Sequence, residues 1–199
     1  MDYSKLTDLQ LDTLKELFNI GTGNSVTALS TMLNKRIDMN VPNLNIAKLQ
    51  EVVDEELEHE VVCVLVKSIG EAPGNILYAF KKETALKIVE ILFGKEVESL
   101  EELEVSAIGE IGNIIASSYI NAITEFTGVS LVSSVPAVVY DTLSSILASV
   151  IVGVSEYNDY ILKIETSFKG DEVNDIMGSF YYIPEAGSLE NILTKIGMN

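Results

Sequence analysis

One arrangement of polar residues occurs twice in this chain of 199 residues. An aspartate or serine is followed after four residues by glutamate, after seven by asparagine and, beyond 22 further residues, by proline. The two copies are Asp12, Glu16, Asn19 and Pro42, and Ser106, Glu110, Asn113 and Pro136. Every member of the second copy lies 94 residues after its counterpart, as 106 − 12 shows. A spacing kept at all four positions indicates an internal repeat whose polar side chains share a task.

The spacing within each copy places the three polar side chains on one face of an α-helix. At about 100° per residue they fall within a stripe about 60° wide, and large apolar residues fall on the opposite face. We therefore predict two long helices, over residues 8–34 and 101–127, that bury their apolar faces and expose the polar triads. Gly21 and Gly23 lack the third glycine and preceding strand of a nucleotide-binding turn, so we expect them to serve close helix packing.

The residue types in the triads favour one kind of chemistry. Only the glutamate is a carboxylate in both triads, whereas glycoside hydrolysis needs two carboxylates that face the substrate. The single histidine, His59, lies in an acidic stretch, so no nucleophilic triad is expected. A neutral amide is suited to orienting a water molecule for attack on a phosphoryl group, because it adds no charge repulsion. The glutamate can then pair with a lysine of a substrate protein. The alternative is that the asparagine is a helix cap or helix contact that both copies inherited.

The repeat extends beyond the polar triads. Residues 74–78 recur loosely as residues 178–182. A long repeat in two copies is typical of two related halves and not of a solenoid, whose units are shorter and more numerous. We predict a single domain over residues 1–199, made of two homologous halves of about 1–95 and 96–199 that a pseudo-twofold axis relates.

Apolar and β-branched runs between turn residues predict a sheet. The expected strands are residues 61–66, 75–80, 146–154, 160–167 and 178–183, and the expected shorter helices are residues 83–93 and 188–196. Extended segments at 37–46 and 131–140 carry the two prolines of the repeat. Together these elements predict an α/β fold of the α+β type, in which two long helices pack on a largely antiparallel sheet.

Composition and charge exclude several classes of function. A net charge of −17 would repel nucleic acids and anionic lipids, so we expect neither nucleic-acid binding nor a membrane role. The longest apolar run, 146–154, is shorter than the roughly 20 residues that cross a bilayer. The first residues lack the pattern of a secretion signal, and the only cysteine, Cys63, is expected to pack in a core strand. We therefore expect a cytoplasmic protein without a disulfide or a structural metal site.

The duplicated pattern matches the signature of the CheC/CheX/FliY family of chemotaxis phosphatases in both halves, and the chain looks most like the CheC branch. The resemblance implies a protein phosphatase that hydrolyses the aspartyl phosphate of the response regulator CheY. The asparagines would position the attacking water and the glutamates would engage the active-site lysine of the regulator. The implied catalytic residues are Glu16, Asn19, Glu110 and Asn113, with Asp12 and Ser106 in supporting roles. The resemblance implies no cofactor of the chain's own, since the bound regulator supplies Mg²⁺.

The resemblance also implies a second partner, the receptor deamidase CheD. Asp141, at the end of a stretch that resembles the docking region, is the expected contact, although an ordinary acid before a helix would have the same spacing. The rival function is that of a non-catalytic adaptor that binds phosphorylated regulator, CheD or both. A flagellar-switch component is a third possibility, which would require a further domain.

Overall fold

A computed structural model describes residues 3–39, 43–55, 60–152, 160–170 and 173–198. After a short 3-10 helix, Tyr3–Lys5, two runs of elements follow in the same order of types. The first run is α1 (Asp8–Leu33), β1 (Asp38–Met39), β2 (Asn43–Lys48), α2 (Leu49–Glu55), β3 (Glu60–Gly70), β4 (Gly74–Lys81) and α3 (Lys82–Phe93). The second run is α4 (Glu102–Thr127), β5 (Leu131–Ser133), β6 (Ala137–Thr142), α5 (Leu143–Val152), β7 (Tyr160–Gly170), β8 (Val173–Pro184) and α6 (Ser188–Lys195).

The described strands form one antiparallel sheet of eight strands, in which the two runs exchange strands. The order is β1-β7-β8-β4-β3-β5, with β2 also paired to β7 and β6 also paired to β3. The first two strands of each run thus pair with the third strand of the other run, and the fourth strands, β4 and β8, pair with each other in the middle. The predicted α+β class, with two long helices on a largely antiparallel sheet, is confirmed.

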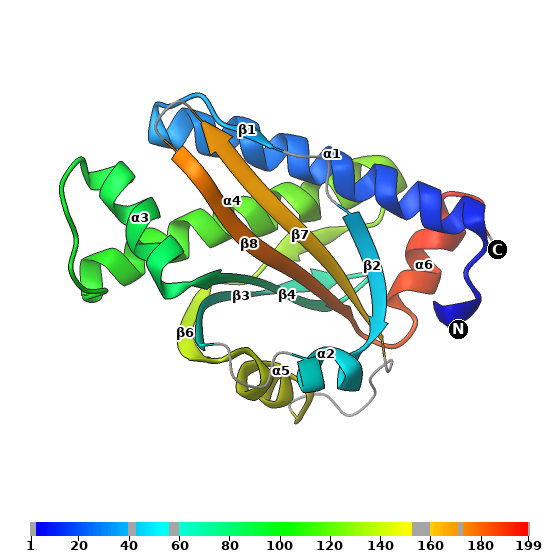
Figure 1. Cartoon of the computed structure of the whole chain (residues 1–199). Coiled ribbons are helices and arrows are strands. Elements are labelled where there is room, and N and C mark those ends of the chain that lie inside the picture. The colour runs from blue at the N-terminus through cyan, green and yellow to red at the C-terminus, as the bar shows by residue number, and fades with distance from the viewer. Residues whose placement is uncertain (1–2, 40–42, 56–59, 153–159, 171–172, 199) are drawn as a thin grey trace.

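Helices cover both faces of the sheet, so the molecule has three layers (Figure 1). The long helices α1 and α4 lie side by side on one face, with α3 and α6 at its margins, and α2 and α5 cover the other face. In β3, Val62 and Val64 face the long helices, whereas Val61 and Cys63 face α2 and α5. Because this strand is buried on both faces, it is an uninterrupted apolar run in the sequence.

The long helices begin and end where their capping residues lie. The Thr7 hydroxyl accepts a hydrogen bond from the backbone of Gln10, whose side chain accepts one from the backbone of Thr7, and this capping box starts α1. Glu101 and Glu104 form the corresponding box of α4, which ends at Gly128 with a φ of 74°. Both helices have 26 residues, within a residue or two of the predicted bounds.

The prediction of a strand at 146–154 was wrong, because residues 143–152 form helix α5. Its buried apolar residues recur at helical spacing and pack against the sheet, namely Leu143, Ile146, Leu147 and Val150. The run is β-branched and short, so its composition alone does not distinguish a strand from a buried helix. Residues 153 and 154 lie outside the described residues.

A second helix on this face, α2, was not expected from the acidic stretch that begins at Glu51. Leu49 and Val52 of α2 are buried against the sheet beside α5. The burial of these two apolar side chains stabilises the helix, although the surrounding sequence is acidic. His59 lies outside the described residues.

Candidate functional site

The helices that carry the two triads cross at a close contact. Gly21 of α1 lies against Tyr119 of α4, so that a Cβ at Gly21 would come within 2.6 Å of the Tyr119 ring and 3.1 Å of its Cα. The Thr22 and Tyr119 hydroxyls lie 2.7 Å apart and share a hydrogen bond. The Tyr119 ring also stacks on Phe180 of β8, at 4.0 Å between centroids, and burial raises its pKa. The expectation of close helix packing is confirmed for Gly21, whereas Gly23 is exposed with open space around it.

The structure places both triads on the outer face of the helix pair, as the helical spacing predicts. Asp12 and Glu16 are exposed and Asn19 is half-buried, and the second copy repeats this, with Ser106 and Glu110 exposed and Asn113 half-buried. The spacing brings the glutamate and asparagine of each copy to neighbouring positions, about 5–6 Å apart at Cβ. Each triad is therefore assembled within one helix and does not depend on a loop.

The two triads lie toward opposite ends of the helix pair. Figure 1 shows α1 and α4 running in opposite directions across the sheet, and each triad occupies the first half of its own helix. Two sites in this arrangement face the same side of the molecule without sharing a side chain.

The inner faces of both helices are fixed in the core, which holds the triads in place. In α1, Leu14, Leu17 and Phe18 are at most 2% exposed. Phe18 sits among aromatic rings, with the Tyr119, Phe180 and Tyr182 centroids 5.8, 6.1 and 6.2 Å away. In α4 the buried residues around the triad include Ile108, Ile111 and Ile115. A rigid helix with a packed inner face presents its outer side chains in a defined geometry before any partner binds.

The surroundings of the two triads differ. Lys15 lies between members of the first triad, and its Nζ is 3.2 Å from a carboxylate oxygen of Asp12 in an exposed ion pair. The matching position of α4 is Gly109, which lies close to Val138 of β6, and Ser106 carries no charge. Gly112 replaces the aromatic ring of Phe18 and lets α4 approach Val64 of β3, to which a Cβ would come within 2.4 Å. One site therefore carries an ion pair and the other is neutral at its first position.

Other residues singled out by the sequence lie away from the triads. Pro42 is outside the described residues, and Pro136 is half-buried between β5 and β6. Asp141 lies in β6 and is exposed, and its side chain accepts a hydrogen bond of 2.7 Å from the backbone of Thr142. Cys63 is buried in β3 as predicted, and burial raises the pKa of its thiol to about 12.

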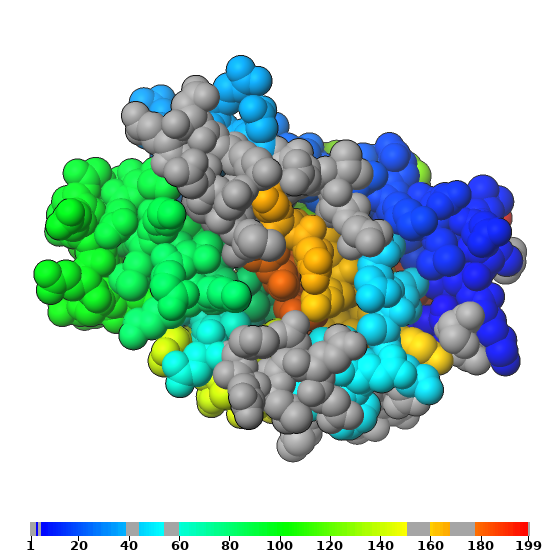
Figure 2. All heavy atoms as spheres, in the orientation of Figure 1, coloured from blue at the N-terminus to red at the C-terminus, as the bar shows by residue number. Residues whose placement is uncertain are grey.

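The sequence does not predict two hollows of the described surface, of which the first lies beside the helix that carries the first triad. A groove of about 470 Å³ runs beside the start of α1, between Leu11 and Lys15 on one side and Leu44 and Lys48 of β2 on the other. A second hollow, of about 590 Å³, lies where β2 and β7 meet α2 on the other face of the sheet (Figure 2). Both depend on the pairing of β2 with β7 from the other run, which spacing along the chain does not reveal.

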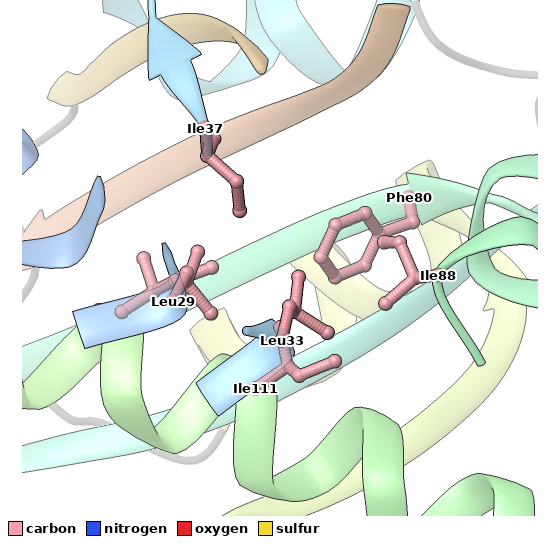
Figure 3. Close-up of a pocket in the computed structure, with 7 residues that line it drawn as sticks. Leu29, Leu33, Ile37, Phe80, Ile88 and Ile111 are labelled. Atoms are coloured by element: carbon pink, nitrogen blue, oxygen red, sulfur yellow. The ribbon is translucent and has the colours of Figure 1, made fainter. Parts of the chain in front are cut away.

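A small apolar cavity beneath α1 and α4 belongs to the core and not to the sites. Figure 3 shows the apolar side chains that line it, which come from α1, α3, α4, β4 and the segment after α1. Its volume is about 20 Å³ and its lining offers no polar group to a water molecule or a ligand.

Neither metal coordination nor membrane spanning finds support in the residues that the structure describes. No group of three or more His, Cys, Asp or Glu side chains in this part of the chain is placed to hold a metal ion. None of the described helices is long and apolar enough to cross a membrane.

Known proteins resemble the chain in sequence and in fold. The sequence model of the CheC-like family matches residues 9–46. The model of the chemotaxis phosphatase CheX family matches residues 62–154. The CheY-P phosphatase CheC of Bacillus subtilis is 27% identical over 203 aligned residues, which cover 98% of this chain and 97% of the relative.

Solved structures share the fold. The crystal structure of Thermotoga maritima FliY has a TM-score of 0.78 and 23% identity, and the match covers 97% of this chain and 98% of that one. CheX in the CheX-CheY-BeF3-Mg²⁺ complex from Borrelia burgdorferi is more distant, with a TM-score of 0.56, 18% identity and coverage of 84% and 97%.

Proposed function

Because the chain belongs to the CheC/CheX/FliY family of chemotaxis phosphatases, we propose that it hydrolyses the aspartyl phosphate of a CheY-type response regulator. The observation that carries the proposal is the pair of complete triads on the outer stripes of α1 and α4, each held by a buried inner face. The names of its relatives, CheY-P phosphatase among them, support the same substrate class.

The proposed reaction is attack by water on the phosphorus of an acyl phosphate. A bond forms between the water oxygen and phosphorus, the bond from phosphorus to the aspartate oxygen breaks, and the products are inorganic phosphate and a free carboxylate. The amide of Asn19 or Asn113 would hold the water in line, with its oxygen accepting a hydrogen bond from that water. A neutral amide orients the nucleophile without repelling the phosphoryl oxygens, and positioning is the main need for a substrate this labile.

The glutamates would fix the regulator in register with the asparagines. Glu16 and Glu110 are exposed one helical turn before the asparagines, so each can pair with a lysine beside the phosphorylated aspartate. Asp12 and Ser106 would add supporting contacts a further turn away. The bound regulator would supply Mg²⁺, which neutralises phosphoryl charge, and this chain would need no metal of its own.

The decisive experiment measures phosphate release from a phosphorylated CheY-type regulator with Mg²⁺. We expect the wild-type chain to accelerate release, Asn19→Ala and Asn113→Ala each to retain activity from the other site, and the double variant to be inert. Asn24→Ala is a matched control, because Asn24 is an exposed asparagine of α1 that lies about 120° from the stripe. It should release phosphate as the wild type does.

The same experiment separates an enzyme from an adaptor. If the wild-type chain binds phosphorylated regulator but never accelerates release, even with CheD present, the triads are a binding surface and the adaptor function replaces the phosphatase.

CheD is the second partner that we propose, with Asp141 as a contact. Asp141 lies at the end of β6, next to the exposed side chains of Val139 and Tyr140, 37% and 50% exposed. An exposed edge strand with apolar side chains and a carboxylate at its end is suited to docking a protein. Asp141→Asn should weaken retention of CheD in a pull-down while leaving phosphate release from the regulator alone unchanged, and equal retention would exclude Asp141 as a contact.

A further inference from the structure

Each of the two long helices exposes a leucine in its first turn. Leu9 of α1 is 67% exposed and Leu103 of α4 is 63% exposed. The two are counterparts in the repeat, since 103 − 9 is again 94. Of the large apolar side chains exposed in the described part of the chain, this is the one pair that the repeat relates. A single exposed leucine needs no explanation, but a repeated one does.

The two helices have diverged almost everywhere else. When α1 and α4 are aligned by the repeat, the positions that hold the same residue are Leu9/Leu103, Glu16/Glu110, Asn19/Asn113, Ile20/Ile114 and Ala28/Ala122. The isoleucines and alanines are half-buried or buried, so packing accounts for them. The leucine and the glutamate are the two that are exposed in both copies. Leu9 and Leu103 therefore share the pattern of a proposed site residue.

Local helix structure does not explain the leucines. The capping boxes at both helix starts use other residues, Thr7 with Gln10 and Glu101 with Glu104. An apolar staple across a helix start joins the residue before the cap to the fourth helical residue, and those positions are Leu6 and Leu11 in α1. Leu9, the second helical residue, takes part in neither the capping box nor the apolar staple.

The leucines continue the polar stripes. On the helical wheel Leu9 falls about 20° from Glu16 and lies about 10 Å before it along the axis. The same geometry relates Leu103 to Glu110. A partner that covers the glutamate and asparagine of one helix and extends toward the start of that helix would therefore reach Asp12 or Ser106 and then the leucine.

We propose that Leu9 and Leu103 are docking residues, each of which inserts into an apolar patch of the response regulator about 15 Å from its phosphorylated aspartate, the length of the ten helical residues that separate each leucine from its asparagine. The proposal rests on the proposed function and names a further determinant of the same sites. The occupant that we infer is the regulator, because each leucine lies on the stripe of a triad and both triads have one. An apolar contact also suits a chain of net charge −17, because its strength does not depend on charge.

The test isolates one site at a time. In the Asn113→Ala background only the first site turns over, and Leu9→Gln should raise the KM for phosphorylated regulator about tenfold while kcat at saturation is kept. Glutamine favours a helix about as well as leucine, so the helix start is preserved. In the Asn19→Ala background, Leu103→Gln should have the same effect on the second site.

A matched control and a binding measurement complete the experiment. Ile69→Gln removes another exposed apolar side chain, 51% exposed on β3, and should leave KM unchanged in both backgrounds. Binding to a regulator that carries beryllofluoride should weaken about tenfold for Leu9→Gln with Leu103→Gln. An unchanged KM and an unchanged Kd would overturn the docking role, whereas a wild-type chain that releases no phosphate would overturn the proposed function instead.

Discussion

The crossing of α1 and α4 leads to a prediction about two glycines of one helix. Gly21 faces Tyr119 at the crossing, whereas Gly23 faces solvent and nothing lies within 4 Å of a Cβ placed there. Replacing an exposed glycine of a helix by alanine stabilises the helix by about 1 kcal/mol, because alanine loses less backbone entropy on folding. We expect Gly23→Ala to raise the free energy of unfolding by about that amount.

Gly21→Ala should have the opposite effect. Its Cβ would come within 2.6 Å of the Tyr119 ring, which cannot swing away, because its hydroxyl binds Thr22 and its ring stacks on Phe180. The new methyl group must push the helices apart, and overpacking of this kind costs about 1–3 kcal/mol. The helix-propensity gain is common to both variants, so the difference between their free energies of unfolding measures the overpacking cost and should be about 1–3 kcal/mol.

The assay is urea unfolding of both variants and the wild type, followed by far-UV circular dichroism. Because Gly21 lies two residues after Asn19, Gly21→Ala should also lower phosphate release at the first site, measured in the Asn113→Ala background. If both alanine variants were stabilised equally, the helices would not be in contact at Gly21 and the account of how the triads are held would fail.

Four further predictions concern buried side chains and the dependence of stability on pH. Tyr119→Phe leaves the buried Thr22 hydroxyl without this partner and should lower the free energy of unfolding by about 1 kcal/mol, measured in urea. The raised pKa of Cys63, about 12, keeps its buried thiol protonated, so iodoacetamide at pH 8 should label the chain in urea but not when folded. The folded chain also holds this proton where the unfolded chain loses it, so the free energy of unfolding should fall between about pH 9 and 12, and Cys63→Ala should reduce that fall. A hydrogen bond from the backbone of Ser130 lowers the pKa of Glu71, so its contribution to stability is present above the ordinary pKa and is lost as the pH falls through the lowered one. Acid titration of Glu71→Gln should show a smaller loss of stability in that window, and an unchanged titration would contradict the assignment.

The sequence predicts the long helices and the placement of the triads well, because both depend on local rules. Capping by Thr7 and termination at Gly128 follow from the preferences of single residues. The outward position of Glu16 and Asn19 follows from helical periodicity, once Leu14 and Phe18 are assigned to the core.

The remaining features depend on contacts between distant segments. The β-branched composition of the run from Ile146 predicts a strand, although its buried residues belong to a helical face that begins at Leu143. The groove beside Lys15 exists only because β2 pairs with β7 of the other run. The contact of Gly21 with Tyr119 likewise joins residues far apart in the chain, and no local pattern predicts which residue a helical glycine will meet.

The exchange of strands between the two runs gives the chain the topology of a symmetric dimer whose subunits are tethered in one polypeptide. In a true dimer of identical subunits, any substitution appears in both copies and changes both sites at once. A tethered pair is free of that constraint, and each site can be tuned alone while the shared sheet holds both. The ion pair of Asp12 with Lys15, set against Ser106 and Gly109 at the matching positions, is a difference that two identical subunits could never acquire.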